Sequence, residues 1–282
     1  MKRTATVRAE AAGRRGRTII TIAIANQKGG VGKTTTAVNL AACLSRAGQR
    51  VLLVDLDPQA NATDHLGQPN PEDEGASSYA LIAEKEPDFR KIIIPVSPNL
   101  QLAPGHIALA EMDLKLHSAI NRETRLQRCL TQLQADFDFV IIDCAPNLGV
   151  TTVNAFCAAT HVLIAIQTNW FAYEALRRLT AIINEVIDES NPELIVLALA
   201  TLHRANVNVN REVLAQVQKD FEDLTLETTI PYTATLVEAS ASHQTILDYA
   251  HGSKAHRAYE DLAKEIISRV ERPAEQQAQA QV

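Results

Sequence analysis

The chain has 282 residues, of which 46% are hydrophobic, a composition that suits one large α/β domain with a buried core better than two equal domains. Its formal net charge is −6, and no run of apolar residues approaches the roughly 18 of a membrane span. The four cysteines stand singly, without metal-motif spacing or the density of a secreted disulfide framework, so we expect a reduced, cytoplasmic protein.

The first seventeen residues are strongly basic. This segment has one acidic residue, Glu10, and six basic residues: Lys2, Arg3, Arg8, Arg14, Arg15 and Arg17. Its charge is therefore +5, which leaves −11 for the remainder of the chain. We expect residues 1–17 to form a disordered arm, which either contacts nucleic acid or anionic lipid or is a solvated leader without a role. The apolar run 19–25 is too short for a secretory signal and lacks a cleavage context.

Beyond the arm, β-branched apolar runs alternate with segments of helical periodicity, the pattern of βαβ units. We predict strands at 19–25, 51–54, 100–103, 139–142, 161–166 and 194–200, and helices at 33–46, 107–116, 124–133, 171–187, 209–221 and 253–270. Several strands are apolar throughout, as strands covered on both faces must be. The predicted fold is a single α/β domain of the P-loop NTPase type over residues 18–272, with a mainly parallel sheet and helices on both faces.

Two segments are predicted to be irregular. Residues 68–77 are rich in proline, glycine and acidic residues, which favours a surface loop. Residues 273–282 form a polar tail that we expect to be disordered. This tail has neither the bulky apolar residues nor the cationic face of a membrane-targeting helix, so we expect no membrane partner.

The sequence NQKGGVGKTTT, residues 26–36, lies between a predicted strand and a predicted helix, which is the context of a phosphate-binding loop. Its glycines permit positive φ and let several N–H groups point at one anion, while the helix adds its positive dipole end. Lys33 can reach the β- and γ-phosphates, and the Thr34 hydroxyl can coordinate Mg²⁺. A chance glycine-rich turn is the alternative. The predicted phosphate contacts are Gly29, Gly30, Val31, Gly32, Lys33, Thr34 and Thr35.

The strict pattern GxxxxGK[ST] is not met, because position 27 is glutamine. The form KGGVGKT instead resembles the deviant Walker A box of the ParA/MinD/Soj group of ATPases, and the resemblance extends over residues 19–270. It implies a homodimer that sandwiches ATP, in which Lys28 reaches the phosphates bound by the other subunit, and it places Pro231 among the nucleotide contacts. A cation supplied by the partner would make dimerisation depend on the γ-phosphate. The alternative for Lys28 is a solvent-exposed loop lysine.

Two predicted strands end in aspartates. VLLVDLDPQ places Asp55 and Asp57 on one side of the carboxyl end of a strand, where ligands bind in open α/β sheets. FDFVIIDCAPN ends its strand in Asp143, the pattern of a Walker B aspartate that holds Mg²⁺ through water. The resemblance implies that Asp57 orients the attacking water and that Asp55 contributes to the Mg²⁺ surroundings. Turn residues before Pro58 are the alternative for this pair.

The segment after Asp143 departs from the family's usual DxPPS, because Asn147 takes the place of the serine and alanine that of the first proline. The aspartate itself is present, so the prediction of Mg²⁺ binding is unaffected. Cys144 is predicted to be a small buried residue rather than a nucleophile, since no histidine is near it in sequence.

The predicted reaction is hydrolysis of ATP to ADP and phosphate, with Lys33 and the loop amides holding the phosphates and Asp57 positioning the water. The resemblance further implies non-specific DNA binding by the ATP dimer over the nucleoid. A cargo-bound adaptor protein would stimulate hydrolysis, so that a plasmid, chromosome or protein organelle is segregated or positioned.

Two expected DNA-binding arginines are missing. Tyr232 stands in IPYTATLVEASAS where the family usually has arginine, and Asn206 is near another position that is often arginine. For each substitute an ordinary solvated charge is the alternative. The residues that we predict as substitutes, together with the arm, are Arg204, Arg211, Lys254 and Arg257.

Two other classes of ATPase share this loop. A MinD-like enzyme recruited to membranes would need a C-terminal amphipathic helix, which is missing. A metabolic enzyme such as a nitrogenase-type iron protein or a dethiobiotin synthase relative is the other; the iron protein needs cluster-bridging cysteines, and no suitably flanked pair is present. The aromatic residues Trp170, Phe171 and Tyr173 form either a partner surface or core. The histidines lack ligand spacing, so we expect no zinc site.

Overall fold

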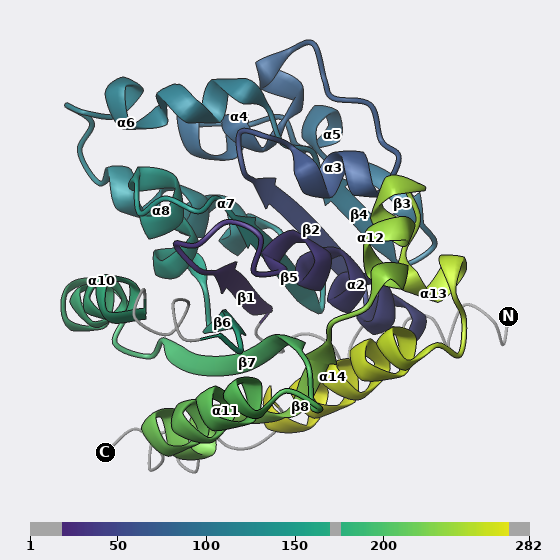
Figure 1. The fold of residues 1–282 in the computed structure, drawn as a ribbon. Coiled ribbons are helices and arrows are strands. Elements are labelled where there is room, and N and C mark those ends of the chain that lie inside the picture. Colours follow the sequence, from purple (N-terminus) through teal and green to yellow (C-terminus); the bar gives the residue numbers. More distant parts are fainter. Residues whose placement is uncertain (1–18, 170–175, 271–282) are drawn as a thin grey trace, which may run out of the picture.

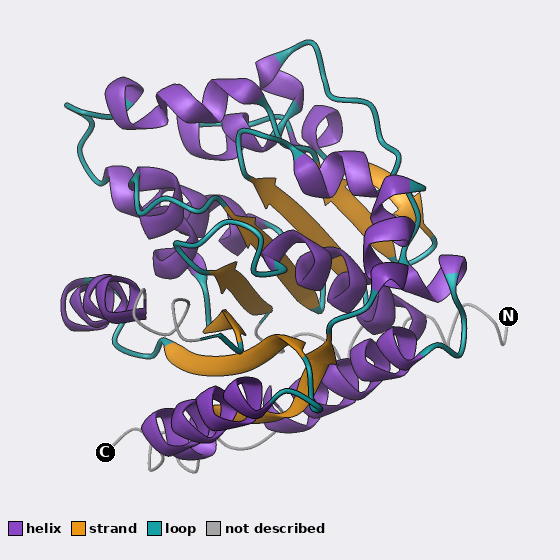
Figure 2. Cartoon of the chain, in the orientation of Figure 1, coloured by secondary structure: helices purple, strands orange, loops and turns teal. Residues whose placement is uncertain are grey.

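The computed structural model describes residues 19–169 and 176–270. An eight-stranded sheet lies between two layers of helices, with strand order β3-β4-β2-β5-β1-β6-β7-β8 (Figures 1 and 2). Neighbouring strands are parallel, except that β3 runs antiparallel to β4. The strands are β1 (Ile20–Ala25), β2 (Val51–Leu56), β3 (Ile94–Ser97), β4 (Leu100–Ala103), β5 (Phe139–Cys144), β6 (His161–Gln167), β7 (Ile195–His203) and β8 (Thr225–Pro231).

The described helices connect these strands and fill both layers. Short 3₁₀ turns η1 (Glu74–Ala76), η2 (Ile107–Glu111), η3 (Arg122–Thr124) and η4 (Glu222–Leu224) adjoin them. The α-helices are α2 (Lys33–Arg46), α3 (Asn61–His65), α4 (Ser78–Ala83), α5 (Phe89–Ile92), α6 (Met112–Lys115), α7 (Arg125–Gln132), α8 (Val150–Ala158), α10 (Leu176–Glu189), α11 (Asn208–Phe221), α12 (Ala234–Ala241), α13 (Ile246–Tyr249) and α14 (Lys254–Val270).

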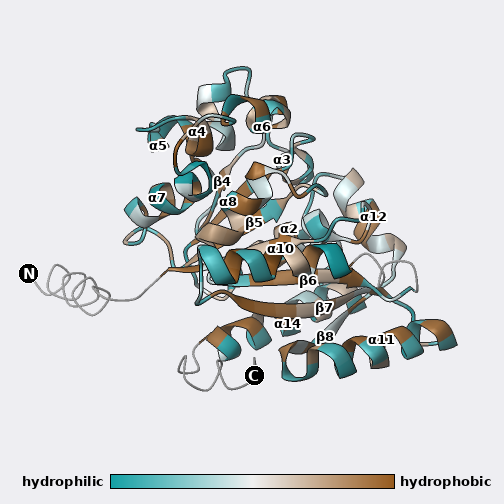
Figure 3. Cartoon of the chain, turned by 90° about the vertical axis from the view of Figure 1, so that its left-hand side faces the viewer, coloured by the Kyte–Doolittle hydropathy of each residue, from teal (hydrophilic) through white to brown (hydrophobic). Residues whose placement is uncertain are grey.

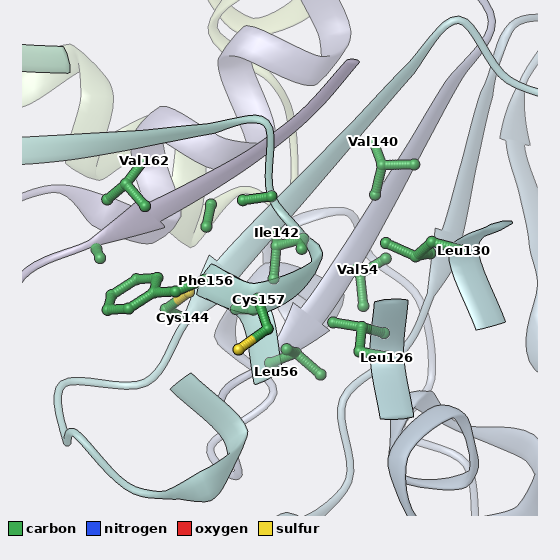
Figure 4. Close-up of a cluster of buried hydrophobic side chains, with 14 of the residues drawn as sticks. Val54, Leu56, Leu126, Leu130, Val140, Ile142, Cys144, Phe156, Cys157 and Val162 are labelled. Atoms are coloured by element: carbon green, nitrogen blue, oxygen red, sulfur yellow. The ribbon is translucent and has the colours of Figure 1, made fainter. Parts of the chain in front are cut away.

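Each face of the sheet has its own apolar core. One face packs against α4, α7, α8, α10 and α11, and a part of this core around Cys144 and Phe156 is shown in Figure 4. The other face packs against α2, α12, α13 and α14. The inner strands β6 and β7 are hydrophobic along most of their length, whereas the outer helices α10 and α11 have one hydrophilic side (Figure 3). This confirms the predicted α/β fold, since parallel strands buried on both faces read as continuous apolar runs.

The six predicted strands are all present, with ends that differ by up to three residues for β7. Strands β3 and β8 were not predicted, because both are edge strands whose apolar residues are interrupted by polar residues or proline. The predicted helix 107–116 is wrong in type over its first half, which is the 3₁₀ turn η2, and only α6 is α-helical. Of the predicted helix 171–187, the part from Leu176 onward is confirmed. Four predictions lie outside the described residues: the start of this helix, the aromatic residues Trp170, Phe171 and Tyr173, the arm 1–17 and the tail 273–282.

The edge strand β8 is fastened by α14. The Glu265 carboxylate accepts hydrogen bonds from Glu227 N at 2.8 Å and Thr228 N at 2.9 Å. Arg269 pairs with Glu265 at 2.9 Å and donates to the Thr225 carbonyl at 2.9 Å. Side chains of α14 therefore occupy backbone groups that an edge strand would otherwise leave open for pairing with another chain.

Candidate nucleotide-binding site

The predicted phosphate loop joins β1 to α2 at the carboxyl edge of the sheet. Gly30 and Gly32 have φ of 73° and 87°, values at which a side chain would be strained. Gly32 is the N-cap of α2 and offers no side chain to its first N–H groups. These amides and the helix dipole are therefore free to face an anion.

Two buried polar side chains hold the loop in place. Asn26 donates to the Ala165 carbonyl of β6 at 2.7 Å and accepts from the Lys28 N–H at 2.9 Å. Thr201, on β7, donates to the Val31 carbonyl at 2.7 Å. Sequence reasoning missed both contacts, because each joins positions more than a hundred residues apart without any local pattern. These two hydrogen bonds attach the loop to β6 and β7 and so fix its position before a ligand arrives.

The two lysines of the loop have different surroundings. Lys33 is buried, and its ammonium donates to the Lys28 carbonyl at 3.2 Å. Burial lowers the pKa of Lys33, and the negative charge of Asp143 partly offsets this. Lys28 is half-buried and forms no ion pair with a described residue. The Lys33 ammonium is thus held by one long hydrogen bond to a carbonyl oxygen, which a phosphate can replace.

The strand-end aspartates lie side by side, because Asp55 of β2 is opposite Asp143 of β5 in the parallel register. One Asp55 oxygen accepts from Thr63 N at 2.9 Å and from the Thr63 hydroxyl at 2.8 Å, and the other accepts from Asp57 N at 3.2 Å. Burial raises the pKa of Asp55 to about 6, although these donors lower it. Asp55 therefore organises the loop that carries Asp57.

Asp143 has no such partners. It is fully buried, and neither carboxylate oxygen accepts a hydrogen bond of ordinary geometry from the described part of the chain. Burial raises the pKa of Asp143 well above its usual value and Asp55 adds to this, whereas the nearby Thr34 hydroxyl and Lys33 lower it. A buried carboxylate without hydrogen bonds of ordinary geometry is costly, and a divalent cation would satisfy it.

The residues around Asp143 fit Mg²⁺. Over residues 19–169 and 176–270, no three His, Cys, Asp or Glu side chains converge as a metal site. Mg²⁺ does not require such a group, since it commonly takes one or two protein oxygens and completes its shell with phosphate and water. The Asp143 carboxylate and the nearby Thr34 hydroxyl supply two such oxygens beside the phosphate loop.

A pocket of about 580 Å³ opens above the loop. Asp57 lines it and is 7% exposed, with one oxygen accepting from Gln59 N at 3.0 Å. Several lining residues were not predicted, because none of them belongs to a motif of its own: Asn61, Asp64, His65, Ala110 and Ser240. The loop residues Gly29, Gly30, Gly32, Lys33, Thr34 and Thr35 line the pocket, whereas Lys28, Val31, Asp55, Asp143 and Pro231 do not.

The segment after Asp143 forms one wall of this pocket through residues 145–147 and leads directly into α8. The first N–H of α8, at Val150, donates to the Asp113 carboxylate of α6 at 2.7 Å. A Cβ at Gly149 would meet the same carboxylate at 2.6 Å, so a larger residue there would displace the Asp113 side chain. Helix α6 is thereby tied to the pocket wall. Cys144 is buried, as predicted, and burial raises the pKa of its thiol.

The predicted DNA residues are exposed and come from two segments. Arg204 and Arg211 belong to the β7–α11 connection and its helix, and Lys254 and Arg257 belong to the start of α14. The Arg204 guanidinium lies over the Tyr232 ring, 3.8 Å from its centroid.

Within the described ranges, no helix is long and apolar enough to cross a membrane.

Comparison with known proteins extends these observations. A family described as an AAA domain matches residues 19–196. The chain is 40% identical over 248 residues to the sporulation initiation inhibitor protein Soj of Bacillus subtilis, which covers 88% of this chain and 98% of that protein. It is 38% identical over 250 residues to the chromosome partitioning protein ParA of Myxococcus xanthus, with 88% of each covered.

Solved structures match over similar lengths. Cobyrinic acid a,c-diamide synthase of Mycobacterium smegmatis with bound ADP and magnesium has a TM-score of 0.77 and 33% identity, covering 89% of this chain and 95% of that one. A plasmid partition protein of Borrelia burgdorferi bound to AMPPNP has a TM-score of 0.76 and 26% identity, covering 89% and 99%. The near-complete coverage of Soj, together with the loop and the strand-end aspartates, leads to one conclusion: the chain belongs to the ParA/Soj family of partition ATPases.

Proposed function

We propose that this chain hydrolyses ATP as a homodimer, binds DNA non-specifically in its ATP state, and positions or segregates a cargo over the nucleoid. As a member of its family it is a magnesium-dependent ATPase. The observation that carries the proposal is the contrast between the two loop lysines. Lys33 is buried beside the carboxylates, whereas Lys28 is half-buried outside the pocket lining and pairs with no described residue.

This contrast supports a role for Lys28 in a second subunit. Its own phosphates would be held by Lys33, the loop amides and the N-terminus of α2, so a second lysine is not required in the same pocket. A lysine donated across a dimer would place positive charge where negative charge develops in the transition state. Pairing of subunits would then depend on the γ-phosphate.

The reaction assigned to the pocket is attack by water on the γ-phosphorus, with cleavage of the bond to the β,γ-bridging oxygen and release of ADP. Asp57 would orient the water, since it lines the pocket and its loop is organised by Asp55. Asp143 and Thr34 would hold Mg²⁺, with Asp55 beside them, and the bound ion would neutralise charge on the phosphates. Pro231, at the end of β8, is proposed as a contact to the remainder of the nucleotide.

The proposal is tested by the oligomeric state of Lys28→Ala. Wild-type protein should double in mass on addition of ATP and Mg²⁺ in multi-angle light scattering. Lys28→Ala should remain monomeric while it still binds ATP, because Lys33 and the loop are intact. Lys85→Ala removes an exposed lysine elsewhere and should dimerise normally. A Lys28→Ala protein that dimerises like wild type would remove the assignment.

DNA binding is tested separately. Loss of two phosphate contacts per subunit in Arg204→Ala/Arg211→Ala should weaken binding of the ATP-loaded dimer to non-specific duplex and make it less steeply dependent on salt, by a slope change of about 4 in log–log form. Arg177→Ala/Arg178→Ala on α10 removes the same charge from exposed positions and is the control. Binding that is absent, or insensitive to salt, would reject a DNA role.

The cellular parts of the proposal are the adaptor and the location. An adaptor bound to the cargo would stimulate hydrolysis and so release the dimer from DNA. A fluorescent fusion should follow the nucleoid in the cytoplasm, and a peripheral membrane signal would favour the MinD-like alternative.

A further inference from the structure

A second hollow, which we call the groove, lies far from the nucleotide pocket, at the amino-terminal ends of the strands. It measures about 960 Å³, against about 580 Å³ for the nucleotide pocket. Its floor is the beginning of the last three strands, with His161, Ile195 and Leu226, and its walls are η4 and α14. Because these strands are parallel, the groove lies where they begin and the phosphate loop lies where they end.

The rim of this groove is acidic. Glu222, Asp223 and Glu227 are exposed, and none forms an ion pair with a described residue. The lining cations are already engaged: Lys264 pairs with Asp261 at 3.1 Å, and Arg269 with Glu265 at 2.9 Å. The apolar floor therefore has three uncompensated carboxylates beside it, which suits an extended cationic segment.

The chain itself supplies such a segment at this place. The basic arm leads into β1 at Ile20, and Ile22 is paired with His161 of the groove floor. The arm thus joins the sheet one strand away from the floor, about 5 Å across. Its 17 residues can extend up to roughly 60 Å, so the groove is within reach. Its charge of +5 is opposite to that of the rim.

We propose that residues 1–17 dock in this groove of their own chain. The C-terminal tail also leaves α14 nearby, but Glu271 and Glu275 against Arg272 give it the sign of the rim. Docking engages the arm's cations, so a nucleic acid can bind the arm only in competition with the groove. That consequence rests on the proposed DNA function, whereas the docking itself does not.

The test is the rate at which trypsin removes the arm of the full-length protein, measured by intact mass with ADP present and DNA absent. The groove variant is Glu222→Gln/Asp223→Asn/Glu227→Gln. Cleavage at the arm's arginines should be about fivefold faster in this variant, the size expected for the loss of three exposed ion pairs. The control, Glu185→Gln/Asp188→Asn/Glu189→Gln, removes the same charge from exposed positions on α10 and should match wild type.

Salt provides a second readout that needs no substitution. Raising the ionic strength from about 0.05 M to about 0.5 M should bring the wild-type rate up to that of the groove variant, because exposed charges are then screened. Equal rates in wild type and groove variant at low salt would overturn the proposal. So would protection that disappears on tenfold dilution of the protein, since the arm would then be docking in a second copy.

Discussion

Asp143→Asn is expected to stabilise the nucleotide-free protein while removing its response to magnesium and ATP. The wild-type carboxylate is fully buried, and neither oxygen accepts a hydrogen bond of ordinary geometry from the described residues. The amide has nearly the same shape, so the substitution breaks no such bond and opens no cavity. It removes the cost of burying the acid, together with the smaller favourable interactions of the carboxylate with Lys33 and the Thr34 hydroxyl.

The size of this cost can be bracketed. A buried charged group left without a partner costs about 2 kcal/mol or more. If the carboxyl instead takes up a proton on folding at pH 7, against an ordinary pKa near 3.9, the cost is about 1.36 kcal/mol per pH unit, or roughly 4 kcal/mol. Because Asp143→Asn also removes the attraction between the carboxylate and Lys33, we expect the gain in stability to lie near the lower of these two values. A gain of about 2 to 4 kcal/mol corresponds to a melting temperature higher by roughly 4 to 16 °C.

The dependence on pH carries a definite sign. The pKa of Asp143 is raised in the folded protein, so folding binds a proton at pH values between the unfolded and the folded pKa. Wild-type stability therefore falls as the pH rises through that window, and the variant lacks this loss. Its advantage should grow from pH 5 to pH 8.

The assay is urea unfolding in EDTA without nucleotide, followed by thermal melts with and without Mg²⁺ and ATP. Asp138→Asn is the matched contrast, because this aspartate accepts from the Arg50 N–H at 2.9 Å and from its guanidinium at 2.9 Å. That variant should lose about 1–3 kcal/mol. An Asp143→Asn protein that is no more stable than wild type at pH 7 to 8 would refute the reasoning.

Three further outcomes are expected. Asp57→Ala should bind ATP and dimerise but hydrolyse ATP much more slowly, because the attacking water loses the carboxylate that orients it. Undiminished phosphate release would contradict this role. Thr201→Val leaves the Val31 carbonyl without its buried donor, so we expect a loss of about 1–2 kcal/mol in urea unfolding and weaker ATP binding by calorimetry; unchanged affinity would show that the loop needs no tether. Burial lowers the pKa of His161 from 6.5 to about 4, so wild type should lose about 3 kcal/mol as the pH falls through that range. His161→Gln should remove most of this acid sensitivity, and identical urea midpoints for the two proteins at pH 4.5 and pH 7 would count against it.

Much of the site could be predicted because its signals are local. The phosphate loop is one contiguous segment between a strand and a helix, and aspartates at the ends of parallel strands must reach the same edge of the sheet. Asp55 and Asp143 accordingly lie opposite each other in register. Helices with one apolar side, such as α7 and α11, were located within one or two residues of their ends.

The remainder depends on contacts that leave no periodic trace. Helix α8 is buried almost all round, so its apolar residues show no one-sided stripe. Strand β8 is mostly polar, with the sequence TLETTIP, and it is completed by α14, a helix that follows it by more than twenty residues. The different environments of Asp55 and Asp143 likewise cannot be read from the sequence, because only the fold gives Asp55 the donors of Thr63 and leaves Asp143 without a hydrogen bond of ordinary geometry from the described residues.

The hydrogen bond between Asp113 and the first N–H of α8 connects α6 to the segment that forms one wall of the nucleotide pocket. The same short helix carries Leu114, whose side chain is 81% exposed. An exposed apolar side chain is therefore joined to the pocket wall at Asn147 through one hydrogen bond and a few residues of chain.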